Sequence, residues 1–99
     1  MEPPLQAGRS RVQTGETAKA KGHLGDLLAL IPGHFAGQSL LAEIELLSGS
    51  TERAAELYAD LVKRSPQLTE VTNLGLALVL LARYAEAEAS FRKARELAS

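Results

Sequence analysis

Apolar positions recur along this chain with the spacing of helices that are buried on one or more sides. Residues 34–47 and 68–82 are mostly apolar, whereas residues 51–64 and 85–98 alternate apolar and polar side chains at helical spacing. In 51–64 the apolar stripe consists of Ala54, Leu57, Tyr58, Leu61 and Val62. An apolar helix followed by an amphipathic one predicts a helical hairpin whose first helix is covered on more than one side.

Glycine and proline indicate where these helices end. Ser48-Gly49-Ser50 follows the apolar segment 34–47, and Gly49 tolerates the left-handed backbone conformation that commonly ends a helix. Pro66 stops the next helix, because proline lacks the amide hydrogen that a helix interior requires. The chain is therefore expected to form short helices joined by tight turns.

The same classes of residue return every 33 or 34 positions. Five sets of positions share this offset: Ala20, Ala54 and Ala87; Leu24, Tyr58 and Phe91; Leu27, Leu61 and Ala94; Gly15, Gly49 and Ala82; Pro32 and Pro66. Several sets at one period are difficult to obtain by chance. We interpret residues 1–99 as a single repeat domain with units of about 1–34, 35–67 and 68–99, each expected to form two helices.

The first unit is the poorest copy of the pattern. Its second helix is expected to carry an apolar stripe made of Ala20, Leu24, Leu27, Leu28 and Ile31. The residues before Gly15 contain few apolar side chains and a proline pair, Pro3-Pro4. We therefore expect residues 1–6 to be disordered and at most a frayed helix near residues 7–14.

These sets of positions resemble the tetratricopeptide repeat, a 34-residue helix–turn–helix unit. The family's small residue, large ring and closing proline correspond here to Ala20, Ala54 and Ala87, to Tyr58 and Phe91, and to Pro32 and Pro66. The family's early tryptophan is absent, with Gln38 and Val71 in its place. The resemblance is clearest over residues 35–98 and weakest over residues 1–14.

The resemblance implies an all-α fold, an α-solenoid of about three helix–turn–helix repeats wound into a right-handed superhelix. Two helices of one repeat should cross closely at the small residues Gly75 and Ala87, and the large side chains of Tyr84 and Phe91 should fill the space beside them. The first helix of each repeat should then pack over the second helix of the preceding repeat. This packing explains why the first helices are mostly apolar.

In this family the concave face, lined by first helices, holds peptides or helices of other proteins. By resemblance, a partner protein would therefore be bound at Ser39, Glu43, Thr69, Thr72, Asn73, Leu76 and Leu80. The positions expected on this face include no Lys or Arg, which argues against capture of a terminal carboxylate. Asn73 either contacts the partner or bonds within its own repeat. Leu76, Val79 and Leu80 either line the groove or belong to the core.

Composition narrows the function further. The net charge is −1, so the chain lacks the basic character of a nucleic-acid-binding domain. There is no cysteine, which suits the cytoplasm, and the longest run without a polar side chain, 74–82, is far shorter than a membrane span of about 20 residues. We expect no nucleic-acid or membrane partner.

Catalytic and metal-binding patterns are missing as well. The two histidines, His23 and His34, lie eleven residues apart without cysteine, and no phosphate-binding or nucleophile motif is present. We therefore expect a non-enzymatic interaction module with no cofactor and no metal. Two alternatives remain open: an accessory repeat domain of a larger enzyme, for example a transferase, and a scaffold that self-associates into a homo-oligomer through exposed stack ends.

Overall fold

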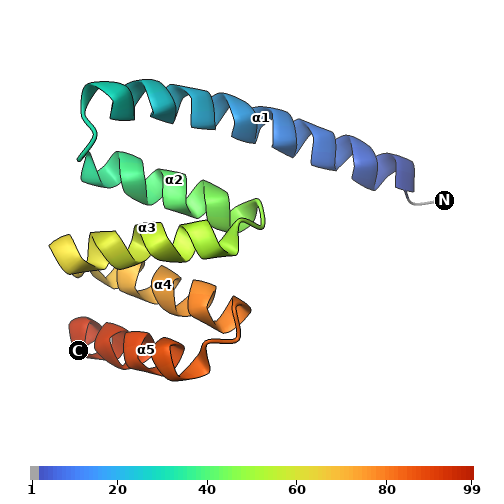
Figure 1. Cartoon of the computed structure of the whole chain (residues 1–99). Coiled ribbons are helices and arrows are strands. Elements are labelled where there is room, and N and C mark those ends of the chain that lie inside the picture. Colours follow the sequence, from blue (N-terminus) through green and yellow to red (C-terminus); the bar gives the residue numbers. More distant parts are fainter. Residues whose placement is uncertain (1–2) are drawn as a thin grey trace.

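The computed structural model describes residues 3–99 of the chain, with side chains described from Gly15 onward. Five helices follow one another: α1 (Pro3–Leu30), α2 (Phe35–Leu47), α3 (Thr51–Arg64), α4 (Leu68–Leu80) and α5 (Tyr84–Ala98) (Figure 1). The described part of the chain contains no strand. The ends of α2 to α5 agree with the sequence prediction to within two residues, because their start and stop signals are local.

The helices stack in sequence order, each packed against the next (Figure 1). α2 also contacts α4, whereas among the described residues α1 does not reach α3 and α3 does not reach α5. α2 and α4 therefore lie closer to each other than α1 does to α3 or α3 does to α5. This arrangement confirms the predicted helical solenoid, with α2 and α4 as its inner helices.

The first unit differs from the prediction. The sequence predicted a helix over the second half of this unit, preceded by at most a frayed helix near residues 7–14, whereas the structure has one continuous helix, α1, of 28 residues. The expectation of disorder over residues 1–6 is wrong for 3–6, which belong to α1, while residues 1 and 2 lie outside the described residues. The sequence before Gly15 offers few apolar side chains, so a hairpin there would bury too little surface to offset the cost of ordering a turn.

From Gly15 onward, α1 packs on α2 through most of the predicted stripe. Leu24 is buried, and Ala20, Leu27 and Leu28 are half-buried. Ile31 is 50% exposed, so its assignment to the stripe is wrong. It follows the last residue of the helix, where the chain already turns toward α2.

The core lies between α2, α3 and α4. Ala42, Ala54, Tyr58 and Leu61 form one cluster in which no side chain is more than 1% exposed. The surrounding partly buried side chains are those of Phe35, Leu46, Leu57 and Leu74. Because Ala42 and Ala54 present only methyl groups, the helices approach closely there and the larger side chains fill the space alongside.

The contact between α4 and α5 depends on Gly75. A Cβ atom at this position would lie 2.8 Å from Cε1 of Phe91, so the ring occupies the space that any side chain would need. Ala87 is 2% exposed, which agrees with its predicted place in this contact. Tyr84 is 66% exposed, and the prediction that it fills the space beside the contact is wrong. As the first residue of α5 it stays at the surface, while Phe91 covers Gly75.

α2 and α4 end in the same type of turn, with Gly49 and Ala82 at equivalent positions. Their amides donate to the carbonyl three residues earlier at 3.2 and 2.9 Å, and the following amide donates to the carbonyl five residues earlier at 2.8 Å in both turns. The φ angle is +91° at Gly49 and +61° at Ala82. Because a side chain disfavours this left-handed conformation by about 1–2 kcal/mol, Ala82 is strained and Gly49 is not.

Replacing Ala82 by glycine should stabilise the chain by about 0.5–1 kcal/mol, because relief of the left-handed strain exceeds the added flexibility of the unfolded chain. The reverse change in the equivalent turn, Gly49→Ala, should destabilise by about 1 kcal/mol. Urea unfolding followed by circular dichroism measures both changes. A loss of stability in Ala82→Gly would show that the turn carries no strain.

The variant Ala87→Leu should cost about 1–3 kcal/mol of stability, because the added carbons have no space between α5 and α4. Ala89 lies two residues further along the same helix and is exposed, so Ala89→Leu serves as the matched control and should change stability by less than about 0.5 kcal/mol. Thermal denaturation compares the two. Equal midpoints for both variants would contradict the register of α5 on α4.

Candidate functional site

Each inner helix exposes one stripe of side chains. In α2 the stripe consists of Ala36, Leu40, Glu43 and Leu47. In α4 the exposed side chains after Leu68 are Thr69, Thr72, Leu76, Val79 and Leu80. Because α2 packs against α1, α3 and α4, its exposed stripe faces the one side that no described helix covers. The offset of 33 residues relates Ala36, Glu43 and Leu47 of α2 to Thr69, Leu76 and Leu80 of α4, so the two stripes occupy equivalent faces of consecutive repeats.

The seven residues predicted to bind a partner all lie on α2 and α4, and they differ in exposure. Glu43, Thr69, Thr72, Leu76 and Leu80 are exposed, whereas Ser39 and Asn73 are half-buried. The exposed fractions are 44% for Leu76, 38% for Val79 and 60% for Leu80. These three side chains therefore belong to the surface of α4 and not to the core.

Asn73 connects two repeats. Its Nδ2 donates a hydrogen bond of 3.1 Å to the hydroxyl oxygen of Tyr58 on α3. The sequence left open a bond within the repeat of Asn73, and the partner found here belongs to the preceding repeat. The carbonyl oxygen of Asn73 accepts no hydrogen bond from the described residues, so the amide still has an acceptor to offer.

Glu70 is the residue of this region that sequence reasoning missed. It lies on α4, is only 5% exposed, and accepts a 2.5 Å hydrogen bond through Oε2 from the hydroxyl of Ser39 on α2. Its other oxygen, Oε1, is buried without a hydrogen-bond donor among the described residues. One signal was available: Glu70 is the single charged residue in α4, at the position where α2 has Gly37.

Tyr58 lies beneath these groups. Burial raises the pKa of its hydroxyl above the ordinary value of 10.0, the hydrogen bond from Asn73 opposes this, and the negative charges of Glu43 and Glu70 raise it further. The phenol is therefore neutral at physiological pH. Both carboxylates lie near enough to the hydroxyl to act on its ionisation.

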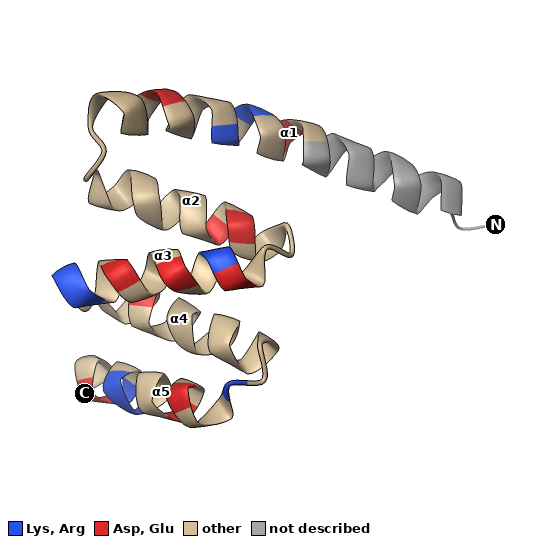
Figure 2. Cartoon of the chain, viewed as in Figure 1, with Lys and Arg blue, Asp and Glu red and all other residues tan. Residues whose placement is uncertain are grey.

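Glu45, the other buried glutamate, is fully compensated. It is 4% exposed, and its carboxylate pairs with Lys21 Nζ of α1 at 3.2 Å and with Arg53 Nε of α3 at 2.8 Å. These ion pairs tie α1, α2 and α3 together. The inner helices contain no Lys or Arg, as the absence of blue from α2 and α4 in Figure 2 shows. Once Glu45 is paired, Glu43 and Glu70 remain as the negative charges of the inner helices.

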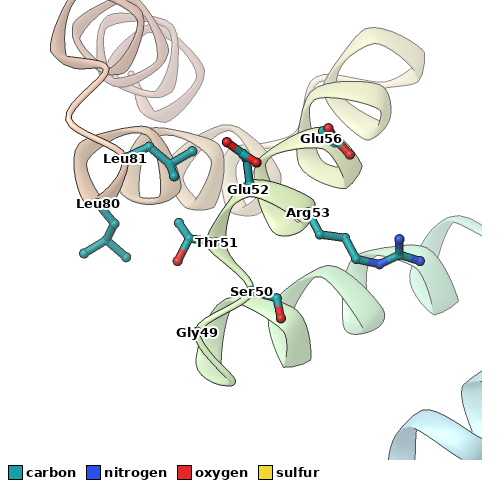
Figure 3. Close-up of a pocket in the computed structure, with 8 residues that line it drawn as sticks. All are labelled: Gly49, Ser50, Thr51, Glu52, Arg53, Glu56, Leu80 and Leu81. Atoms are coloured by element: carbon teal, nitrogen blue, oxygen red, sulfur yellow. The ribbon is translucent and has the colours of Figure 1, made fainter.

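An open hollow of about 590 Å³ lies where α3 begins and α4 ends. Figure 3 shows Leu80 and Leu81 opposite Thr51 and Glu52 across it, and Leu80 is the one predicted binding residue in its lining. Among the described residues no group of three His, Cys, Asp or Glu side chains is placed to hold a metal ion. The hollow is best described as an extension of the exposed surface at the carboxyl end of α4.

None of the described helices combines the length and the apolar character needed to cross a bilayer.

Comparison with known families gives a match. A family model described as "Tetratricopeptide repeat" matches residues 5–69, about two thirds of the chain. It extends further into the first unit than the resemblance seen in the sequence and ends at the start of α4. The hairpin of α4 and α5 nevertheless repeats the turn geometry of α2 and α3. No curated protein sequence matches the chain at a significant level.

The raised pKa of Tyr58 predicts a specific dependence of stability on pH. Since the folded state holds the phenol proton more tightly than the unfolded state, this contribution is complete below about pH 10 and is lost as the pH rises beyond it. Unfolding at pH 8 to 11 should therefore show a steeper loss of stability in the wild type than in Tyr58→Phe. Tyr84→Phe, which changes an exposed phenol, is the control and should retain the wild-type slope.

Proposed function

Because the chain belongs to the tetratricopeptide repeat family, we propose that it is a non-enzymatic module that holds a peptide or helix of another protein along α2 and α4. Repeats of this family generally mediate contacts between proteins. The observation that carries the proposal is the row of exposed apolar side chains on the inner helices. α2 and α4 are the most apolar of the described helices, yet four of their leucines are 44–79% exposed: Leu40, Leu47, Leu76 and Leu80.

Exposed leucines in line on two neighbouring helices suit the apolar anchors of a partner segment. Thr69 and Thr72 add hydroxyls beside them, and the free acceptor of Asn73 suits an amide of the partner. The hydroxyl of Ser39 already donates a hydrogen bond to Glu70, so its proposed role is to orient that carboxylate. The stripes contain no Lys or Arg, which disfavours a partner that ends in a carboxylate at this surface.

The proposal is tested with a random-peptide phage library selected on the immobilised full chain, followed by calorimetric titration of a selected peptide. Leu76→Asp should weaken binding roughly tenfold or more, because it places a charge among the apolar anchors. Leu97→Asp is the matched control, since Leu97 is 43% exposed against 44% for Leu76 but lies on α5. Both variants should fold. Equal peptide affinities of the two variants would show that the peptide does not bind along α2 and α4.

Asn73→Ala should weaken binding of the same peptide while helicity is retained. The lost hydrogen bond to Tyr58 should also cost about 0.5–1.5 kcal/mol of stability. Circular dichroism and calorimetry measure the two effects separately. If neither folded Asn73→Ala nor folded Leu76→Asp changes the affinity, the partner binds the outer face or the stack ends, and the proposal is wrong.

A further inference from the structure

The inner helices carry negative charge without a counter-charge. Glu45 is satisfied by two cations, but neither Glu43 nor Glu70 forms an ion pair with the described residues. Figure 2 shows mixed charge on α3 and α5, whereas α2 and α4 show red alone. The surface that the proposed function assigns to a partner is therefore acidic and apolar at once.

Glu70 provides a second, independent observation. It is 95% removed from solvent, its carboxylate bridges from α4 to Ser39 on α2, and Oε1 has no donor. A buried charge held by one hydroxyl is unfavourable, because water has been removed and no cation replaces it. In the chain alone, this carboxylate is a cost to stability that packing does not explain.

The positions of the neighbouring groups converge on one spot between α2 and α4. Ser39 and Glu43 lie one helical turn apart on α2, and Glu70 and Asn73 lie one turn apart on α4. The bond between Ser39 and Glu70 joins the two pairs, and both carboxylates act on the Tyr58 hydroxyl beneath. Glu43 is the exposed member and Glu70 the buried one.

We infer that the partner segment carries a lysine or arginine side chain that pairs with Glu43 between α2 and α4. This inference rests on the proposed function and specifies its partner. Glu70 adds its uncompensated charge from below, where solvent screens it little. The apolar stem of the basic side chain contacts Leu40, which precedes Glu43 on α2, and Leu76, which follows Glu70 on α4. An acidic residue at the same place of the partner is repelled.

The experiment uses peptides selected from the random library on the full chain. Selected peptides that bind the inner helices should share a Lys or Arg flanked by apolar residues. One such peptide, and its counterpart with the basic residue changed to Gln, are then titrated against wild type, Glu43→Gln and Glu70→Gln. Each variant should lower the affinity of the basic peptide roughly tenfold, and neither should lower that of the Gln peptide. Asp60→Asn removes an exposed carboxylate on α3 that has no ion pair among the described residues, and it should leave both affinities unchanged.

The thermal midpoint of Glu70→Gln separates a binding role from a structural one. Loss of an uncompensated buried charge should raise or preserve the midpoint while affinity falls, whereas a purely structural residue would lower the midpoint and weaken both peptides equally. The latter outcome overturns the inference.

The two proposals fail in different ways. Peptides that lack Lys and Arg but lose affinity in Leu76→Asp would overturn the basic anchor and leave the interaction module standing. If selection gives no peptide, or only peptides insensitive to Leu76→Asp, both proposals fall.

Discussion

The close approach of consecutive helices over small side chains is the contact on which this structure depends. Ala42 and Ala54 let α2 and α3 meet around Tyr58, and Gly75 lets the ring of Phe91 lie against α4. With these contacts made, α2 and α4 come within reach of each other, and α2 is enclosed on all sides but one. The apolar side chains that remain outside are therefore gathered on one face. The candidate site is thus a consequence of how the repeats pack and needs no separate loop or insertion.

The two buried glutamates show how the same side chain serves different ends. Glu45 is surrounded by cations from α1 and α3, so its burial is compensated and it holds three helices together. Glu70 has only the hydroxyl of Ser39, so its charge is compensated poorly within the chain. A buried ion pair and a buried lone carboxylate differ in energy by far more than their similar exposure suggests. That difference is why the inferred contact with a basic side chain of the partner involves Glu70 and not Glu45.

Much of the fold was predictable because its signals are short-range. The set containing Gly49 and Ala82 located the two turns, and the alanine set located the close contacts of α3 and α5. The residues that the resemblance proposes for partner binding lie on α2 and α4. The failures concern positions whose outcome depends on distant partners. Tyr84 stays at the surface, Ile31 leaves the stripe, and the first unit forms one long helix because the sequence before Gly15 has little to bury.

Helical period and turn residues are properties of neighbouring positions, and the 33-residue offset can be read directly along the chain. The sequence by itself therefore determined α2 to α5 and the order in which they stack. It did not decide which leucine of α4 faces out: Leu76 is 44% exposed and Leu78, two residues on, is 5% exposed. Nor did it show that Glu70 would be enclosed against Ser39, 31 residues away. Exposure and charge compensation depend on which helices meet in space, and only the tertiary structure brings α2, α3 and α4 together around that carboxylate.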